Sequence, residues 1–360
     1  MKKVVCFFVG NMTRGGGTER MASLIANKIS TNENYKIIIV GLYGDINNSF
    51  FGLNQNIVYI VLNDKNKSNI SIKDTVLKLR KVLSKNNVNI LINVDVMLNI
   101  FSLPAIFCTK IKMITWEHFN YLDDIGSKNT KFIRKISMYF CKKYIVITKQ
   151  DKEKFKKYFK GNSKVIQIYN TCMIDETYND YDVNSKVIIS AGNMFPVKGF
   201  DLAIEVGKIV FSKYPDWKWY IYGDGIELEN IKTLIKTNRL ENNFVLKART
   251  KNLDKAFREA AMFILPSRME SFGLVLLEAQ ANNLPVVSFD VPSGPSEIIS
   301  NNINGYLVEE LNVNMMAEKI CELIRNKDLR RSFSLKSKIK FKEFEIQTIL
   351  SKWYEVIESI

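Results

Sequence analysis

Two carboxylates, Glu270 and Glu278, lie eight positions apart in a segment that follows an apolar run. We expect Glu270 in a loop after a strand, and Glu278 about two turns inside the helix that follows. In that geometry Glu270 could accept hydrogen bonds from sugar hydroxyls, and Glu278 could accept them from a ribose diol. Spacing alone also allows two solvated carboxylates on one helix face, so the neighbouring residues must decide between these alternatives.

The residues between the two glutamates are suited to binding an anion. Ser271 is a plausible N-cap, and Phe272, Gly273 and Leu274 begin the predicted helix. The first N–H groups of a helix lack an intrahelical partner and lie at the positive end of the helix dipole. Gly273 would let a ligand approach the backbone closely. The segment therefore predicts phosphates at the helix start, with a carboxylate on either side.

This segment belongs to an alternating pattern of strands and helices that runs through the chain. Strand candidates lie at 3–10, 36–43, 57–62, 89–94, 112–117, 144–148, 186–193, 218–225, 243–248, 262–267 and 284–290. The first of these runs lacks polar alternation, as expected for a parallel strand covered on both faces. The pattern predicts an α/β fold with doubly wound sheets.

The length of 360 residues favours two domains, because one hydrophobic core rarely serves so long a chain. We expect an N-terminal Rossmann-like domain at 1–175 and a C-terminal one at 183–340, joined by the polar segment 173–185. An amphipathic helix ends the chain, and we expect residues from about 341–360 to complete the first domain. Five scattered cysteines without a CxxC pair indicate reduced thiols.

Positive charge is concentrated in the first half of the chain. Residues 1–180 carry 28 Lys and Arg against 14 Asp and Glu, whereas 181–360 carry 24 against 23. An uneven distribution of this kind points to an anionic partner for the first half: a membrane leaflet, a nucleic acid or a polyanionic substrate. No apolar run approaches the roughly 18 residues of a membrane-spanning helix.

Two basic segments at 128–143 and 151–161 are interleaved with aromatic residues. Their cations and aromatics are Lys128, Lys131, Arg134, Lys135, Lys142, Lys143, Phe132, Tyr139, Phe140, Phe155, Tyr158 and Phe159. Basic, aromatic, amphipathic helices are typical of an anionic membrane surface. Two solvated helices with aromatic core faces would explain the aromatics equally well, but not the charge of the whole half. We expect peripheral association with a membrane.

His118 is the only histidine in the chain and follows the predicted strand 112–117, with Glu117 and Asn120 beside it. Open α/β sheets bind ligands at the carboxyl ends of their strands, so a site role and a structural role are both open. Gly15, Gly16 and Gly17 form a turn that would allow close approach of a diphosphate or an acceptor. Residues 293–298 could present backbone to a ligand or cap a helix.

Four segments, in order, resemble the family 4 glycosyltransferases, which are retaining enzymes of the GT-B fold. Residues 266–299 resemble the donor-binding signature of that family, and its EX7E motif falls on Glu270 and Glu278. Residues 190–206 are similar to the phosphate clamp, 223–231 to a Gly-rich turn and 15–27 to the N-terminal Gly-Gly turn. The nearest subgroup contains enzymes of bacterial exopolysaccharides, capsules and lipid-linked oligosaccharides.

The resemblance implies two Rossmann-like domains facing across a cleft, with a C-terminal helix crossing back to the first domain. The second domain would bind a nucleotide sugar, with Lys198 on the diphosphate and Glu270 on the sugar. His118 would contact the donor sugar. The family's usual Arg falls at Asn193, which weakens the phosphate clamp, and Arg249 is our candidate for a replacement cation.

The reaction implied by the family is transfer of a hexosyl or N-acetylhexosaminyl group from a UDP-sugar, with retention of configuration. The acceptor would be a saccharide linked to undecaprenyl diphosphate at the inner face of the plasma membrane, so the protein would be cytoplasmic and peripheral. We expect no cofactor and no metal, because no Asp-x-Asp motif follows a strand in a suitable context. We expect no nucleic-acid partner.

Three alternatives remain at this point. A GT-B epimerase acting on a nucleotide sugar would need no acceptor. A nucleic-acid-binding protein would explain the basic half, although no recognisable nucleic-acid module is present. A catalytically inactive GT-B protein would fit Asn193 in the place of the family's Arg.

Overall fold

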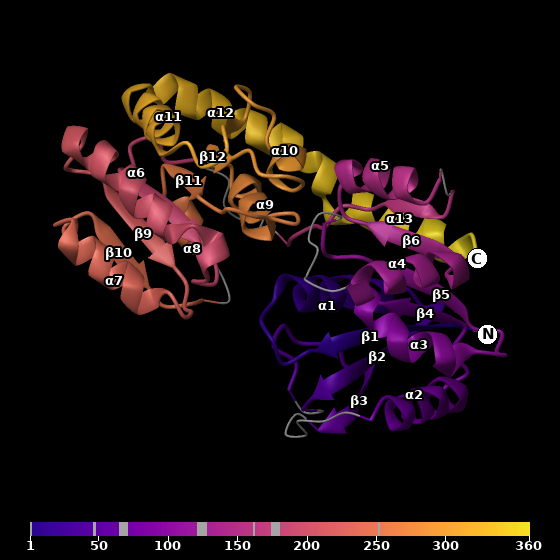
Figure 1. Ribbon diagram of the computed structural model, residues 1–360. Coiled ribbons are helices and arrows are strands. Elements are labelled where there is room, and N and C mark those ends of the chain that lie inside the picture. The colour runs from indigo at the N-terminus through magenta and orange to yellow at the C-terminus, as the bar shows by residue number, and fades with distance from the viewer. Residues whose placement is uncertain are drawn as a thin grey trace. The chain divides into compact units, whose positions relative to one another are not determined.

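The computed structural model describes residues 2–45, 48–64, 71–120, 128–160, 163–173, 181–250 and 253–360. The chain divides into two compact units, each built on one sheet (Figure 1). Unit 1 comprises Met1–Asn170 and Gln347–Ile360, and unit 2 comprises Thr171–Ile346. Residues 174–180 of the predicted linker lie outside the described residues.

The sheet of unit 1 is parallel throughout, with the strand order β3-β2-β1-β4-β5-β6-β7. Its strands are β1 (Lys3–Asn11), β2 (Tyr35–Gly44), β3 (Val58–Asp64), β4 (Ile90–Asn93), β5 (Lys112–Trp116), β6 (Lys143–Val146) and β7 (Val165–Gln167). The short strand β7 was not predicted from the sequence. The order reverses between β1 and β4, which is where doubly wound sheets form their binding crevice.

The helices of unit 1 connect these strands as crossovers. They are α1 (Gly17–Ser30), α2 (Ile72–Lys85), η1 (Val96–Leu98), α3 (Asn99–Ile106), α4 (Lys128–Phe140) and α5 (Lys149–Tyr158), with α13 (Ile346–Glu358) added from the end of the chain. Side-chain caps fix two of the helix starts. Ser71 Oγ accepts a hydrogen bond from Asp74 N at 3.2 Å, and Thr148 Oγ1 accepts one from Asp151 N at 3.0 Å.

Unit 2 repeats the architecture with a six-stranded parallel sheet in the order β10-β9-β8-β11-β12-β13. Its strands are β8 (Val187–Ala191), β9 (Lys218–Tyr222), β10 (Phe244–Lys247), β11 (Met262–Leu265), β12 (Val286–Phe289) and β13 (Gly305–Val308). Here the order reverses between β8 and β11. The doubly wound α/β pattern predicted from the sequence is therefore present in both units.

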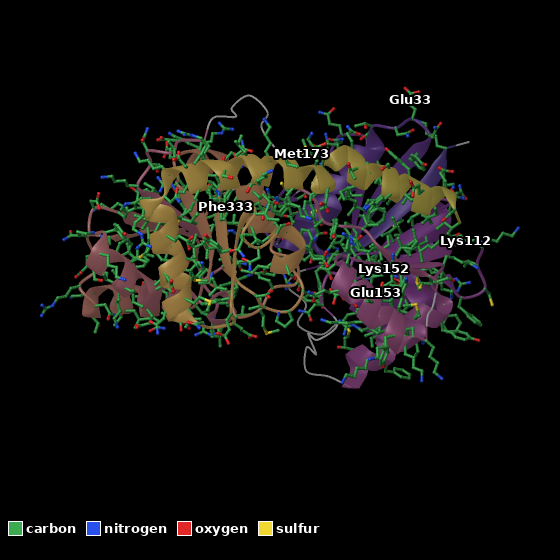
Figure 2. All side chains as sticks on the ribbon, turned by 90° about the horizontal axis from the view of Figure 1, so that it is seen from above. Glu33, Lys112, Lys152, Glu153, Met173 and Phe333 are labelled. Carbon is green, nitrogen blue, oxygen red and sulfur yellow. The ribbon has the colours of Figure 1, made fainter. Side chains whose placement is uncertain are left out.

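The helices of unit 2 cover its sheet. They are η2 (Pro196–Lys198), α6 (Phe200–Lys213), α7 (Leu228–Thr237), α8 (Asp254–Arg258), α9 (Leu274–Ala281), α10 (Pro295–Ile298), α11 (Val313–Arg325), α12 (Lys327–Phe341) and η3 (Lys342–Phe344). In Figure 2, Phe333 of α12 lies among the packed side chains of this unit. Its ring lies 5.2 Å from that of Tyr306, so α12 is anchored on the strand β13.

The end of the chain passes from unit 2 to unit 1 near Ile346. Thr171 Oγ1 donates a hydrogen bond to the Phe344 carbonyl at 2.5 Å, and the Phe344 ring lies 6.0 Å from Phe272. These contacts keep residues up to 346 with unit 2. Beyond them α13 packs on unit 1, where Trp353 is fully buried with its ring 4.7 Å from that of Trp116.

We predict that Trp353→Ala lowers the free energy of unfolding by about 3–5 kcal/mol, because it empties a large buried site between α13 and β5. Urea denaturation followed by circular dichroism measures the loss. Ser351→Ala, at an exposed position of the same helix, is the control and should change stability by no more than about 0.5 kcal/mol. Equal stability of the two variants would show that α13 is not part of the unit 1 core.

Candidate functional site

The predicted site residues follow the carboxyl ends of strands in both units. In unit 2, Asn193 and Lys198 follow β8, Arg249 follows β10 and Glu270 follows β11. In unit 1, the Gly15–Gly17 turn follows β1 and His118 follows β5. Because each sheet is parallel, the loops of one unit meet at one edge of its sheet.

Lys198 and Glu270, both predicted for the donor site, are in direct contact. Lys198 Nζ donates to Glu270 Oε1 at 2.5 Å, and Ser267 Oγ donates to the same oxygen at 2.8 Å. Glu270 is buried, and Lys198 remains partly exposed. A charge-assisted bond of this kind holds the ammonium group at the carboxyl edge of the sheet while leaving one side of it accessible. Sequence reasoning missed Ser267.

The loops that carry these two residues are locked together. Gly199 has φ 65°, and a Cβ atom there would lie 2.0 Å from the Pro266 carbonyl oxygen, so only glycine fits. Arg268 N donates to Val197 O at 2.8 Å. The Arg268 guanidinium donates to both carboxylate oxygens of Asp201, at 2.7 and 2.6 Å, and these bonds lower the pKa of Asp201. The Lys-Gly pair that follows a strand is the sequence feature from which the structural role of Gly199 could have been predicted.

The start of α9 differs from the prediction. Ser271 is not its N-cap: Gly273 is, with φ 85° and ψ 57°, and Phe272 precedes the helix. Residue 270 forms an isolated parallel bridge with Ser293, and a Cβ atom on Gly294 would lie 2.3 Å from the Phe272 carbonyl oxygen. This pairing holds the segment out of helical conformation. Glu278 consequently lies about one turn inside α9, not two.

Neither glutamate is a solvated carboxylate on a helix face. Glu270 is 7% exposed and Glu278 is 6% exposed. Buried carboxylates are rare unless they are paired or functional, so their burial favours the binding interpretation of the motif over the alternative. Of the two roles predicted for the segment 293–298, the structure shows the helix start, because α10 begins at Pro295. Ser293 forms its bridge with residue 270, and presentation of backbone to a ligand stays a prediction.

The other donor-site candidates lie on exposed loops. Asn193 is exposed, and its carbonyl oxygen accepts a hydrogen bond from Phe195 N at 2.8 Å. The Gly-Asp-Gly turn packs against the same loop, because Met194 N donates to the Asp224 carbonyl at 2.8 Å. Arg249 is exposed two positions after β10 ends. Its role as a replacement cation stays a prediction.

His118 is buried at the carboxyl edge of the unit 1 sheet, with its ring 4.4 Å from that of Trp116. Burial lowers the pKa of His118 to about 3, so the imidazole is neutral at physiological pH. Within the described part of the chain, its Nε2 atom has no hydrogen-bond partner. A neutral imidazole of this kind is suited to a hydrogen bond with a hydroxyl group rather than to an ion pair.

A buried ion pair fixes the turn that carries His118. Arg134 Nε donates to Glu117 Oε2 at 3.0 Å, and Arg134 Nη2 donates to the Asn120 carbonyl at 3.2 Å. Tyr144 OH donates to the same Glu117 oxygen at 2.9 Å. Burial raises the pKa of Glu117 to about 7, although the charge of Arg134 opposes the shift. The sequence did not predict this pairing.

The burial of Arg134 corrects one part of the membrane prediction. Arg134 was expected among the exposed cations of the basic helix, but it is only 3% exposed. Its positive charge is paired with the Glu117 carboxylate and is not presented to an external surface. Lys131 and Lys135, on either side of it in the sequence, are exposed.

The Gly-Gly turn after β1 is not an open anion site. Gly16 is the N-cap of α1, and a Cβ atom there would lie 2.5 Å from Glu19 Oε2. Glu19 thus places a carboxylate at the positive end of this helix, where it would repel a phosphate. Of the two ligands predicted for Gly16 and Gly17, this placement favours the uncharged saccharide part of an acceptor over a diphosphate.

Among the described residues, no group of three or more His, Cys, Asp or Glu side chains could hold a metal ion. No helix in the described ranges is long and apolar enough to cross a bilayer.

We predict that Arg134→Met destabilises the protein by about 3–5 kcal/mol at pH 8, because it leaves the Glu117 carboxylate buried and uncompensated. The folded-state pKa of Glu117 lies above its unfolded value, so this acid is neutral in the folded state at low pH. The loss should therefore be smaller at pH 5 than at pH 8. Denaturation curves at both pH values measure it.

Lys135→Met is the control for Arg134→Met, since it removes an exposed cation from the same helix. It should change stability by less than about 0.5 kcal/mol at either pH. If Arg134→Met lowers the free energy of unfolding equally at both pH values, the Arg134 charge does not compensate the Glu117 carboxylate.

Comparison with known proteins identifies the family of the chain. Residues 177–339 match the family described as glycosyl transferases, group 1. A glycosyltransferase of Haemophilus influenzae is 30% identical over 99% of this chain and 100% of its own length. The amylovoran biosynthesis glycosyltransferase AmsD of Erwinia amylovora is 23% identical over 97% of this chain and 98% of its own length.

The fold has close counterparts among solved structures. Anabaena HepE, solved in complex with UDP and glucose, matches with a TM-score of 0.82 over 99% of each chain, at 16% sequence identity. At that identity the likeness shows the fold alone, which is GT-B, with two Rossmann-like domains on parallel sheets. The full-length relative and the matched domain show that the chain belongs to the glycosyltransferases and carries a group 1 glycosyltransferase domain in its second unit.

Proposed function

We propose that this glycosyltransferase moves a hexosyl or N-acetylhexosaminyl group from a UDP-sugar to a saccharide acceptor, with retention of configuration. The contact between Lys198 and the buried Glu270 is the observation that carries the proposal. It places a cation suited to a diphosphate beside a carboxylate suited to sugar hydroxyls. The structure of HepE with UDP and glucose supports this choice of donor by analogy of fold.

The chemistry assigned to unit 2 is stabilisation of the departing diphosphate. Lys198 supplies a positive charge, and the backbone N–H groups at the start of α9 supply hydrogen bonds. Glu270 would accept hydrogen bonds from the donor sugar, and Glu278 would face the ribose. The leaving diphosphate could itself take the acceptor proton, so no general base is assigned. We propose that neither a metal nor a cofactor takes part.

His118 is proposed to hydrogen-bond a hydroxyl group of the donor sugar in its neutral form. A charged imidazolium would require solvation that the buried position does not offer. The rate should therefore show no dependence on a histidine pKa between pH 6 and 8.

The acceptor is proposed to be a saccharide linked to undecaprenyl diphosphate, used in assembling a bacterial surface glycan. The similarity to AmsD, whose name places it in amylovoran biosynthesis, supports a role in exopolysaccharide assembly. A lipid-linked acceptor also calls for a protein at the inner face of the plasma membrane.

Exposed aromatic side chains on α4 support peripheral membrane association. Phe132 is 61% exposed, Tyr139 is 78% exposed and Phe140 is 59% exposed. An aromatic core face explains the buried Phe155 of α5, but not these three. Exposed lysines, including Lys131, lie on the same helix. We propose that this helix contributes to contact with an anionic leaflet.

We predict that a UDP-sugar raises the melting temperature of the wild-type protein, because a ligand that binds only the native state stabilises it. Lys198→Met should weaken donor binding about 10-fold or more, since a hydrogen bond to a charged group contributes roughly 1.5–3 kcal/mol. A thermal-shift panel of nucleotide sugars measures both effects. Lys236→Met, at an exposed position of unit 2, is the control. If no nucleotide sugar raises the melting temperature of the wild type, the proposed donor site is wrong.

We predict that Arg249→Ala raises the donor KM strongly, because this cation is proposed to replace the Arg missing at position 193. Steady-state kinetics at saturating acceptor provides the measurement. Arg331→Ala, an exposed arginine on α12, should leave the KM unchanged. An unchanged KM for Arg249→Ala would remove Arg249 from the site.

The same assays separate the proposal from its rivals. Release of an epimer from the donor alone would favour a GT-B epimerase. Donor binding without hydrolysis or transfer, across many acceptors, would favour an inactive protein.

A further inference from the structure

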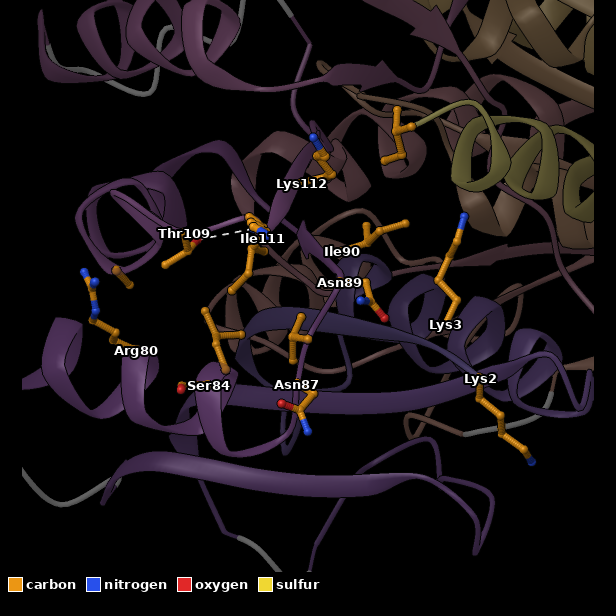
Figure 3. A pocket seen from close by; sticks show the side chains of 15 residues that line it. Lys2, Lys3, Arg80, Ser84, Asn87, Asn89, Ile90, Thr109, Ile111 and Lys112 are labelled. Carbon is orange, nitrogen blue, oxygen red and sulfur yellow. Dashed lines mark hydrogen bonds between the residues drawn. The ribbon is translucent and has the colours of Figure 1, made fainter.

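A pocket opens at the amino edge of the unit 1 sheet, where the parallel strands begin. It has a volume of about 660 Å³ and lies between the C-terminal half of α2 and the starts of β1, β4 and β5. The residues around it include five cations: Lys2, Lys3, Arg80, Lys110 and Lys112. Figure 3 shows Arg80 on one side of the pocket and Lys2 and Lys3 on the other.

The described residues that line this pocket include no Asp or Glu. The other polar side chains of the lining are neutral and include Ser84, Asn87 and Thr109, which can donate hydrogen bonds, and Ile360 at the end of the chain also lines the pocket. At the same edge, Glu358 is paired with Lys3 at 3.4 Å, and Glu33 lines a separate hollow beside Lys2. Figure 2 labels Glu33, which lines that separate hollow, and Lys112, which lines the pocket. The pocket therefore offers cations and donors that suit a phosphate.

Two of the five cations have partners that fix the rim of the pocket. Arg80 Nη1 donates to the Phe107 carbonyl at 3.1 Å, and Lys3 Nζ donates to the Ile357 carbonyl at 3.0 Å. Lys2, Lys110 and Lys112 are exposed, so their ammonium groups are accessible from solvent.

Three exposed aromatic residues lie at this same edge of the sheet. Phe107, 70% exposed, ends α3 just before β5, while Tyr139 and Phe140 end α4 just before β6. The strands β5 and β6 are adjacent, and Lys142 N donates to the Met113 carbonyl at 2.8 Å. The end of α4 is therefore held beside the start of β5, next to the pocket.

We propose that the amino edge of unit 1 docks on an anionic phospholipid bilayer, with a phosphate-bearing headgroup in the pocket and the three aromatic side chains in the interfacial layer. The inference rests on the proposed membrane association and gives it a defined surface. Cations ring a single pocket here, beside apolar side chains that water solvates poorly, and this combination fits a lipid interface. A groove that tracks a nucleic-acid backbone would instead need a continuous path of charge.

The location has a consequence for the reaction. In a parallel sheet the amino and carboxyl edges are opposite, so docking through the pocket leaves the edge that carries His118 uncovered. Docking and donor binding would then use different surfaces, and the saccharide of a lipid-linked acceptor would have to reach from the docked edge to the opposite one.

Co-sedimentation of the full chain with vesicles tests the docking surface. The wild type should bind vesicles of phosphatidylcholine with phosphatidylglycerol, bind phosphatidylcholine alone at least 10-fold more weakly, and be released by high salt. Replacing Lys2, Lys110 and Lys112 together by Gln should weaken binding at least 10-fold. Replacing Lys236, Lys255 and Lys336 of unit 2 by Gln removes the same charge from exposed positions and should leave binding nearly unchanged.

The aromatic contribution is tested separately. Changing Phe107, Tyr139 and Phe140 to Ser should weaken vesicle binding several-fold even at low salt. Changing the exposed Ile226, Leu335 and Ile339 of unit 2 to Ser is the matched control and should have little effect. Circular dichroism of each variant confirms that it is folded.

Several outcomes would overturn the proposal. They are equal loss of binding in the two lysine sets, no binding to anionic vesicles at low salt, or binding of single-stranded nucleic acid that depends on the same lysines. Competition by free glycerol phosphate at low concentration would show a soluble phosphate ligand instead of a bilayer. The donor-induced thermal shift should persist in the Lys2, Lys110 and Lys112 variant. If the wild type binds donor but not vesicles, only the docking proposal is wrong. If it binds vesicles but no donor, only the proposed activity is wrong.

Discussion

The parallel direction of the strands is the constraint on which the placement of every functional group depends. In each unit the strands all end at one edge, so the loops after β8, β10 and β11 lie at the same edge, as do those after β1 and β5. Residues distant in sequence, such as Lys198 and Glu270, are thereby brought into contact. The opposite edge collects strand starts and the ends of α2, α3 and α4, and in unit 1 it is rich in lysine.

Two buried carboxylates show how differently the units use a cation. Glu117 and Arg134 are both almost completely buried. An ion pair in which both partners are buried mainly fixes the local geometry of the chain. Glu270 is buried too, but its partner Lys198 keeps part of its surface exposed. The first pair therefore holds a turn in place, whereas the second presents a charge to an incoming ligand.

Most of the fold could be predicted from sequence, because apolar runs and βα turns are local signals. The EX7E glutamates and Lys198 were instead named from the resemblance to a family, and their roles in binding stay predictions. The N-cap at Ser271 was wrong, because the bridge between residue 270 and Ser293 overrides the local capping preference. The burial of Arg134 was also missed. Its helical spacing matches that of the exposed lysines, and its partner Glu117 lies just after β5, 17 positions away.

Calorimetric titration of the wild type and Glu270→Gln with UDP and with a UDP-sugar tests the central claim most directly. The account predicts that the wild type binds the UDP-sugar more tightly than UDP, because Glu270 accepts hydrogen bonds from the sugar. Glu270→Gln should retain UDP binding and lose most of that difference in affinity. A wild type that binds neither ligand, or a variant with an unchanged preference for the sugar, would contradict it.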